Sequence, residues 1–199
     1  MYKNHTLLSD AELKMLEIFL DLKRHYFAEM TKKSKLTRPR TLRALRGLER
    51  RGILSIKTEA NVKYYSLNNI PKVWTVLSLV EYNKAENLLD KNKTLKRGLE
   101  MFKEKFNQNL IIAIFGSHVK GYATKSSDVD ILLMKEQFSK SEMKKIEDII
   151  DIINGRTGLK LSHHLMKLDE FKKNILSQEI IDNHILIEGG ELFFKMVLQ

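Results

Sequence analysis

Residues 110–134 read LIIAIFGSHVKGYATKSSDVDILLM, and this stretch decides the fold. It begins and ends with apolar runs, residues 110–115 and 131–134. Short runs that are apolar throughout are typical of strands buried on both faces of a sheet. Between the two predicted strands lie Gly116-Ser117 and Asp128-Val129-Asp130. The polar residues of this stretch therefore fall where one strand ends and the next begins.

The Asp-x-Asp segment predicts a metal site. Side chains alternate along a strand, so Asp128 and Asp130 share one face and Val129 points to the other. Magnesium binds oxygen ligands and commonly takes one or two carboxylates together with substrate phosphates. We therefore predict Asp128 and Asp130 as catalytic residues and as ligands of Mg²⁺ or Mn²⁺.

The glycine turn and the polar segment after it predict a nucleotide site. Glycine lets the backbone approach a phosphate closely, and a serine hydroxyl at a helix start can hold the β- and γ-phosphates. Lysine is a suitable point charge for a triphosphate. The predicted ligand is a nucleoside triphosphate, with ATP the first choice, and the predicted nucleotide-binding residues are Gly116, Ser117, His118, Lys120 and Lys125.

The stretch consists of a strand, Gly-Ser, Asp-x-Asp and a second strand, in that order. In this order it resembles the polymerase-beta-like nucleotidyltransferase superfamily, specifically its minimal branch. The resemblance covers about residues 95–198, including segments 167–171 and 183–193. It implies a small mixed sheet flanked by helices. It also implies transfer of a nucleoside monophosphate to an acceptor hydroxyl with release of pyrophosphate. Relatives with this motif act as antitoxins that modify a partner toxin on tyrosine, which implies a protein acceptor such as a cognate toxin.

Members of that superfamily usually carry a third acid on a later strand, where this chain has Ser162. Serine is neither an anionic ligand nor a base near neutral pH. His164 shares the strand face and could take the base role, although a structural role is the simpler interpretation. Asp148 and Asp151 lie on an apparent helix and are expected at its surface. Three possibilities stay open: catalysis with two carboxylates, nucleotide binding without transfer, or a slightly different strand alignment.

The first third of the chain predicts three helices and a hairpin. Helical spacing of apolar residues indicates helices over residues 10–23, 26–34 and 37–51. Two apolar runs, 53–57 and 62–67, follow with a polar turn between them. Over residues 7–68 this order resembles a winged helix-turn-helix domain, with 37–51 as the recognition helix and 57–63 as the wing.

Positive charge is concentrated in this region. Residues 1–70 hold 15 Lys and Arg against 7 Asp and Glu, a net charge of +8, whereas the whole chain carries +10. Leu42, Leu45 and Leu48 line one side of the third helix, and Arg40, Arg43, Gly47 and Arg50 line the other. Such asymmetry favours double-stranded DNA as a partner, although winged helices also serve as protein-docking modules. The predicted DNA-binding residues are Arg38, Arg40, Thr41, Arg43, Arg46, Arg50 and Lys63.

The sequence as a whole predicts an α+β protein of two domains. Their expected bounds are 1–70 for the winged helix-turn-helix, 71–107 for a helical linker broken near residues 90–93, and 108–199 for the nucleotidyltransferase-like domain. The apolar start of the linker suggests a homodimer. The chain has no cysteine, no recognisable secretory signal and no apolar stretch long enough to span a membrane. A cytoplasmic protein without a membrane partner is expected.

Two functions follow from these residues. The chain is either a magnesium-dependent transferase of nucleoside monophosphates attached to a DNA-binding domain, or a transcription regulator that binds a nucleotide or a partner without turnover. The two are compatible, since an antitoxin often represses its own operon.

Overall fold

The computed structural model describes residues 8–122 and 127–199 and divides into two compact units between Val80 and Glu81. In this part of the chain it is an α+β protein with ten α-helices, one short 3-10 helix and two sheets. None of the helices described is long and apolar enough to cross a membrane. The unit boundary lies inside a helix, so each unit is described by itself.

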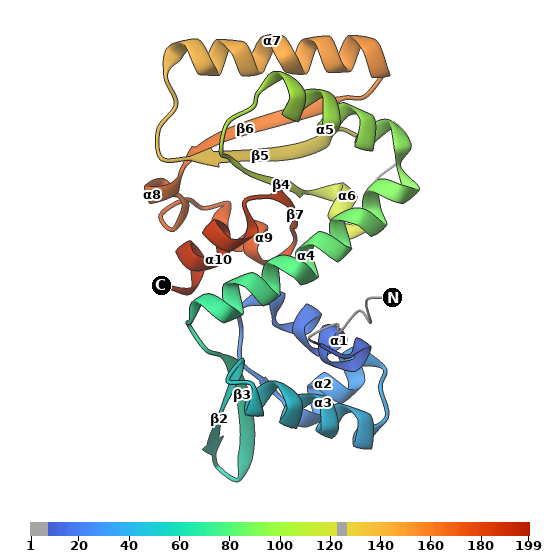
Figure 1. The fold of residues 1–199 in the computed structure, drawn as a ribbon, viewed down its shortest axis with the longest axis vertical. Helices are drawn as coiled ribbons and strands as arrows, with labels where there is room; N and C mark the ends of the chain where they lie inside the picture. Colours follow the sequence, from blue (N-terminus) through green and yellow to red (C-terminus); the bar gives the residue numbers. More distant parts are fainter. Residues whose placement is uncertain (1–7, 123–126) are drawn as a thin grey trace, which may run out of the picture. The chain divides into compact units, whose positions relative to one another are not determined.

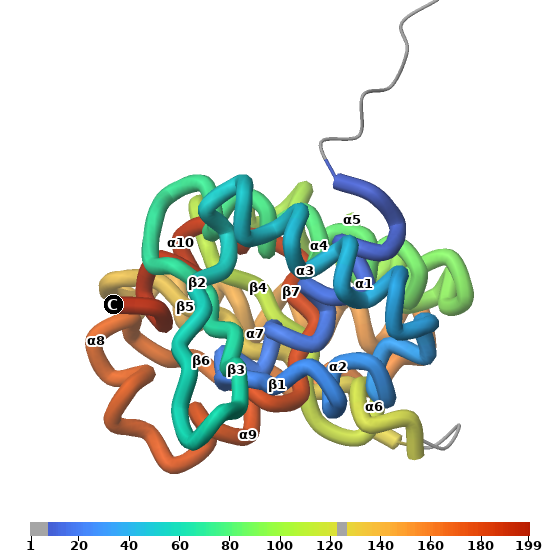
Figure 2. The backbone as a smooth tube through the Cα atoms, turned by 90° about the horizontal axis from the view of Figure 1, so that it is seen from below, coloured from blue at the N-terminus to red at the C-terminus, as the bar shows by residue number. Residues whose placement is uncertain are grey.

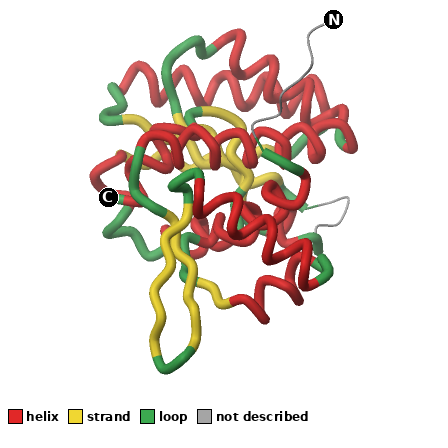
Figure 3. Tube along the Cα trace, turned by 60° about the horizontal axis from the view of Figure 1, so that its bottom comes forward, coloured by secondary structure: helices red, strands yellow, loops and turns green. Residues whose placement is uncertain are grey.

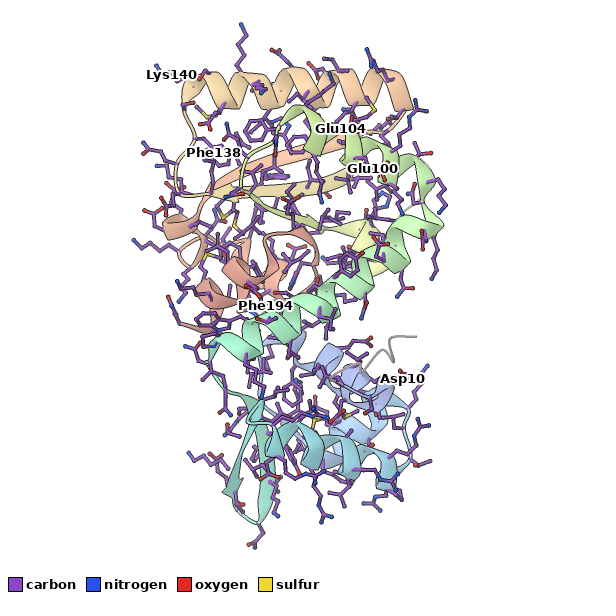
Figure 4. The ribbon with its side chains drawn as sticks, viewed as in Figure 1. Asp10, Glu100, Glu104, Phe138, Lys140 and Phe194 are labelled. Carbon is purple, nitrogen blue, oxygen red and sulfur yellow. The ribbon has the colours of Figure 1, made fainter. Side chains whose placement is uncertain are left out.

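Three helices form most of the first unit. Ser9 and Glu12 make a reciprocal capping box at the start of α1. The short helix η1 ends at Leu22, which adopts the left-handed conformation with φ 58°. The prediction of one helix over 10–23 was therefore too long. Pro39 lies in the first turn of α3, as predicted. The helices are α1 (Asp10–Ile18), η1 (Phe19–Asp21), α2 (Phe27–Ser34) and α3 (Arg38–Arg50). Figure 2 shows their backbone, and Asp10 is labelled in Figure 4.

A three-stranded antiparallel sheet completes this unit. Strands β2 (Leu54–Glu59) and β3 (Val62–Leu67) form the predicted hairpin, which Figure 3 shows in yellow with its green turn. Ala60 and Asn61 both have positive φ, so the two-residue turn has the backbone twist that suits a hairpin. Strand β1 (His25–Tyr26) pairs with β3. Sequence reasoning missed β1 and assigned Tyr26 to a helix.

The side chain of His25 is buried between two carboxylates. Its Nε2 lies 2.9 Å from Asp21 Oδ1 and its Nδ1 lies 2.9 Å from Glu29 Oε1, while Lys33 Nζ lies 2.7 Å from the same Glu29 oxygen. Burial alone would lower the pKa of His25, but the two hydrogen bonds and the carboxylate charges outweigh burial and raise it. In the protonated ring both nitrogens donate, one to each carboxylate.

The predicted helical zone consists of two helices, α4 (Pro71–Lys91) and α5 (Lys93–Lys105). The break falls at Asn92, whose side chain accepts a hydrogen bond from the Leu95 N–H. This confirms the predicted interruption and gives its cause, because asparagine is a preferred N-cap. Glu100 and Glu104, labelled in Figure 4, are exposed on α5.

The second unit contains a mixed four-stranded sheet of order β6-β5-β4-β7. Strands β5 and β6 are parallel, and their connection runs through helix α7 (Lys140–Thr157). The β4–β5 and β4–β7 pairs are antiparallel. The strands are β4 (Ile111–Phe115), β5 (Val129–Lys135), β6 (Leu161–Lys167) and β7 (Ile185–Glu188). The predicted small mixed sheet is thus present.

Helices cover both faces of this sheet (Figure 1). Helices α5 and α7 pack on the face that carries Val129, Ile131 and Leu133. The short helix α6 (Ser117–Lys120) follows β4. The other face is covered by α8 (Leu168–Phe171), α9 (Ser177–Asp182) and α10 (Gly190–Leu198). Both apolar strands are consequently buried, as their composition predicts.

A buried carboxylate anchors the edge strand β7. Glu81, only 1% exposed, accepts a hydrogen bond from the Leu186 N–H at 2.7 Å and one from Lys84 Nζ at 2.6 Å. Lys84 also donates to the carbonyl of His184 at 2.9 Å. The His184 Nδ1–H donates to the Ile180 carbonyl at 2.8 Å, and burial lowers the pKa of this histidine. His184 is therefore a neutral core residue.

Candidate functional site

The turn after β4 requires a glycine for two reasons. Gly116 has φ 75° and ψ −148°, a conformation that residues with a side chain rarely adopt. A Cβ built on Gly116 would lie 3.3 Å from Asp130 Cγ and nearer still to Asp130 Oδ2. The Asp130 carboxylate thus occupies the space beside the glycine backbone, and helix α6 begins with the next residue, Ser117.

The two acids of the Asp-x-Asp segment lie beside this turn. Phe115 and Asp130 are direct partners in the β4–β5 pairing, so the glycine turn and Asp130 meet at one end of the sheet. Asp128 lies just before β5 and is exposed, Asp130 is half-buried, and Val129 between them is 2% exposed in the core. The two carboxylates are therefore on the opposite face from Val129, as predicted.

Ser162 stands beside Asp130. The parallel β5–β6 register pairs the two residues directly. His164 lies two residues further along the same face, with its ring edge-on to Phe115 at 5.2 Å between centroids. In the part of the chain that the structure describes, no group of three His, Cys, Asp or Glu is arranged to hold a metal. Asp148 and Asp151 are exposed on α7, as expected.

The donor set fits one hard cation bound together with a nucleotide. Asp128 and Asp130 offer carboxylate oxygens on one side of the strand, and the glycine turn leaves room where a side chain would otherwise stand. Mg²⁺ commonly takes one or two carboxylates and completes its shell with phosphate oxygens and water. The remaining ligands of such an ion would therefore come from the nucleotide.

The cationic residues predicted to contact phosphate have different surroundings. Lys120 Nζ lies 2.6 Å from Glu179 Oε1 on α9, and the hydrogen bond with this carboxylate raises the Lys120 pKa. His118 Nε2 lies 3.4 Å from the carbonyl oxygen of Ser127. Ser117 is half-buried at the start of α6. Lys125, the fifth predicted residue, lies outside the described residues.

Sequence reasoning missed two residues beside Lys120. Glu179 is remote in sequence and carries no recognisable motif, so no local signal could have identified it. Tyr122 lies two residues after Lys120 and is 64% exposed. Its place between the glycine turn and the two acids was visible in the sequence.

A second candidate surface lies on α3. Five predicted DNA contacts are exposed, and within the described residues none of them forms an ion pair: Arg38, Arg40, Arg43, Arg46 and Arg50. Lys63 is exposed near the tip of the hairpin. A groove of about 670 Å³ runs beside these arginines and the start of α1, and one of about 590 Å³ lies between α3 and the hairpin.

Two residues assigned to the cationic side of α3 are buried instead. Thr41 has no exposed surface, so its side chain cannot reach a ligand without rearrangement. Gly47 packs against Glu12, whose Oε1 also lies 3.4 Å from Arg51 Nε. Both residues face the packed side of the helix. The exposed surface of α3 therefore consists mainly of the arginine side chains.

Comparisons with known proteins match different shares of the chain. Residues 72–188 match the family described as the central palm domain of mitochondrial-like poly(A) RNA polymerase. A protein of Methanocaldococcus jannaschii named "Putative protein adenylyltransferase" is 34% identical over 115 residues, which cover 54% of this chain and 78% of the relative. The solved structure of TrmBL2, an archaeal chromatin protein, covers 90% of this chain and 73% of its own at 18% identity, with a TM-score of 0.32. That score is too low to support an inference. The family match includes Gly116, both acids and Ser162.

Proposed function

Because the chain belongs to the polymerase-beta-like nucleotidyltransferase family, we propose that it transfers a nucleoside monophosphate from a triphosphate, most simply ATP, to a protein hydroxyl. The observation that carries the proposal is the glycine turn packed against Asp130. A backbone without a side chain, two carboxylates and a helix start lie together there. These are the parts that binding a metal–triphosphate complex requires.

In the proposed reaction the acceptor oxygen forms a bond to the α-phosphorus and the bond from that phosphorus to the pyrophosphate oxygen breaks. The hydroxyl proton passes to solvent. The turn at Gly116 and the Ser117 hydroxyl hold the phosphates, while Asp128 and Asp130 hold the cation. A bound Mg²⁺ or Mn²⁺ would stabilise charge on the attacking and leaving oxygens. Ser162 supplies no anion beside Asp130, so two carboxylates would carry out the role that three usually share.

A protein is the acceptor that the comparisons favour. The Methanocaldococcus jannaschii relative is named as an adenylyltransferase acting on protein, and it aligns over more than half of this chain. The acceptor would be a hydroxyl side chain on a partner, such as a cognate toxin. In that case the chain would be a protein-modifying antitoxin.

The test is incubation with radiolabelled ATP and Mg²⁺, alone and with the product of an adjacent gene. Label should enter protein with the wild-type chain and disappear with Asp128→Ala/Asp130→Ala. The matched control is Asp148→Ala/Asp151→Ala, which removes the same charge from the exposed side of α7. Label transfer that survives loss of Asp128 and Asp130 would contradict the proposed site. Absence of label with every triphosphate and partner would favour nucleotide binding without turnover.

We also propose that the first unit binds double-stranded DNA through α3. Five exposed arginines without ion pairs among the described residues form a polyanion-binding surface on one helix. Lys63 on the hairpin would contact the phosphate backbone. By binding DNA the chain would act at its own operator, whether or not the second unit transfers nucleotides.

DNA binding is tested by titrating Arg40→Ala/Arg43→Ala against operator DNA at several salt concentrations. Each lost phosphate contact should reduce the slope of log affinity against log salt by about 0.9. Arg97→Ala/Arg156→Ala removes the same charge from α5 and α7 and should leave the slope nearly unchanged. Equal effects of the two double variants would contradict the assignment of α3.

A further inference from the structure

The groove between α3 and the hairpin is formed by three elements of the first unit. Its volume of about 590 Å³ is within the range of pockets that hold small organic ligands. Leu42, Arg46 and Glu49 line it from α3, where spacings of four and three residues place them on one face of the helix. The hairpin and the start of α2 supply the other walls.

Much of this groove is apolar, although it is open to solvent. Tyr26 is 43% exposed and Val62 is 38% exposed, and both line the groove. Leu42 is half-buried, whereas Leu45 and Leu48 on the same helix have no exposed surface. Removing apolar surface from water stabilises a complex, and exposed apolar patches mark binding sites. The groove therefore favours a ligand with an apolar body.

Three of the side chains that line the groove are aromatic rings, those of Tyr26, Phe27 and Tyr65. Tyr65 pairs directly with Ile56 in the hairpin, so these two side chains share the face of the sheet that borders the groove. Aromatic rings attract one another beyond the area that they bury, and a rigid ligand loses less freedom on binding than a flexible chain. A flat aromatic ligand is therefore favoured over an aliphatic chain.

The hydroxyl of Tyr65 is a donor available to such a ligand. Tyr65 is only 5% exposed and lines the groove, and its hydroxyl forms no hydrogen bond with the residues that the structure describes. Burial, followed by the negative charge of Glu49, raises the pKa of Tyr65. The phenol is therefore protonated near neutral pH and can donate to an acceptor in the ligand.

The charges of the groove complement a single negative charge. Arg46 and Lys63 are exposed and line it, and neither forms an ion pair with a described residue. Glu49 is the one carboxylate among the lining residues, so two cations and one anion leave a net charge of +1. A triphosphate or a DNA strand carries several negative charges, whereas a carboxylate carries one. Arginine also binds a carboxylate through two parallel hydrogen bonds.

We propose that this groove binds an aromatic monocarboxylate, whose carboxylate accepts hydrogen bonds from Arg46, Lys63 and the Tyr65 hydroxyl, and that its binding weakens DNA binding. Arg46 and Lys63 are also proposed DNA contacts, so a bound carboxylate leaves fewer cations for the DNA phosphates. By linkage, DNA weakens binding of the acid by the same factor. The effect on DNA rests on the proposed DNA binding, whereas binding of the acid does not.

The experiment is calorimetric titration of the full chain with 2-naphthoate, a two-ring carboxylate. The wild type should bind one molecule per chain. Arg46→Gln/Lys63→Gln and Tyr65→Phe should each weaken binding about tenfold or more, because each removes hydrogen bonds to a charged group. Lys32→Gln/Lys57→Gln removes the same charge from exposed positions of α2 and the hairpin outside the groove, and should bind like the wild type. Melting curves of all variants verify folding.

Two further probes and a DNA titration complete the test. The alcohol 2-naphthylmethanol keeps the rings without the charge, and decanoate keeps the charge without the rings, so both should bind more weakly than 2-naphthoate. Saturating 2-naphthoate should weaken operator binding by the wild type. The same concentration should have less effect on Tyr65→Phe, which binds the acid more weakly.

Several results would overturn the inference. Failure of 2-naphthoate to bind would do so, as would equal binding of the alcohol or of decanoate. Equal losses in Arg46→Gln/Lys63→Gln and Lys32→Gln/Lys57→Gln would place the acid elsewhere. If 2-naphthoate does not bind and Tyr65→Phe weakens DNA binding, the groove belongs to the DNA surface. Unchanged DNA affinity with the acid bound would overturn the effect on DNA. If the chain binds the acid but no DNA, the proposed DNA function fails and the carboxylate site stands.

Discussion

At the scale of single residues, the turn at Gly116 depends on the absence of a side chain. Gly116→Ala would place a methyl group against the Asp130 carboxylate in a backbone conformation that alanine avoids. We expect the free energy of unfolding to fall by about 1–3 kcal/mol. We also expect binding of ATP with Mg²⁺ to weaken, because Asp130 must move. Chemical denaturation and calorimetric titration with the nucleotide measure the two effects.

Gly155 provides the matched control for that substitution. It lies in α7, where an added Cβ would meet nothing within 4 Å, and its φ is not positive. Gly155→Ala should stabilise the helix by about 0.5–1 kcal/mol and leave nucleotide binding unchanged. If both alanine variants weaken ATP binding equally, the argument from Asp130 is wrong.

The second prediction at this scale concerns Ser162. Ser162→Asp would place a third carboxylate directly beside Asp130 in the parallel register. Like charges on directly paired residues repel each other. We therefore expect Ser162→Asp to have a lower melting temperature than the wild type when no metal is present. Mg²⁺ or Mn²⁺ should reverse the loss, because binding to the folded state stabilises it. The rise in melting temperature on adding Mg²⁺ should exceed that of the wild type.

His163→Asp tests the specificity of the metal effect. It introduces the same charge on the opposite face of β6. It should also lower the melting temperature, but Mg²⁺ should not restore it. Equal recovery of both variants would show that the metal acts elsewhere.

The sequence predicts some of these residues and not others. Gly116, Asp128, Asp130 and Ser162 could be placed because they lie on or beside consecutive strands, where alternation determines the face. The partner of Lys120 could not be predicted, because Glu179 reaches it only through the tertiary fold. Thr41 was assigned to the wrong side of α3 since residues at the edge of an apolar stripe can face either way.

At the scale of elements, strand β7 depends on one side chain of α4. Glu81→Ala would leave the Leu186 N–H and Lys84 without their buried partner. We expect the free energy of unfolding of the second unit to fall by about 2–4 kcal/mol. Amide exchange should accelerate most in residues 185–188. Glu100→Ala, at an exposed position on α5, should have little effect; exchange that stays slow in Glu81→Ala would refute the role of Glu81.

Element boundaries were predicted well where a cap or a turn is encoded locally. The break between α4 and α5 was expected near residues 90–93 and occurs at Asn92. The first helix was predicted too long because its apolar spacing continues past Ile18, whereas the backbone tightens and leaves through Leu22. The two-residue strand β1 exists only through pairing with β3, which is a long-range contact. The local sequence pattern does not indicate such long-range pairings.

At the scale of the whole molecule, the two units should respond to pH in opposite directions. Because the pKa of His25 is raised in the folded protein, its contribution to the free energy of unfolding is complete below pH 6.5. This contribution is lost as the pH rises through the folded pKa. Because the pKa of His184 is lowered in the folded protein, its contribution to the free energy of unfolding is complete above pH 6.5. This contribution is lost as the pH falls toward the folded pKa. Burial raises the pKa values of Asp21 and Glu29, but hydrogen bonds outweigh burial and lower both: those with His25 and the Lys23 N–H for Asp21, and those with Lys33 and His25 for Glu29. The two carboxylates therefore contribute to stability above their ordinary pKa values and lose this contribution at lower pH.

Amide protection factors measured between pH 5.5 and 8 test this expectation. Raising the pH should lower protection in the first unit and raise it in the second, and His25→Gln should remove the trend from the first unit alone. A common direction in both units would contradict the opposite pKa shifts of His25 and His184. Because the two effects oppose each other, the midpoint of global unfolding should vary little.

The overall α+β class was predictable because each region has its own periodicity and charge. Positive charge concentrated in the first third distinguished that part of the chain from the rest before any contact was known. The unit boundary between Val80 and Glu81 was not predictable. It lies within the continuous helix α4, which has no glycine and whose one proline, Pro71, is its first residue.

The protonated form of His25 also offers a signal that can be observed by NMR spectroscopy. Its two N–H protons are buried and each is held by a carboxylate at 2.9 Å, so they exchange slowly with water. Protons of this kind give proton NMR resonances well separated from those of amides. In an unlabelled sample, these resonances would report the integrity of the first unit during a DNA titration.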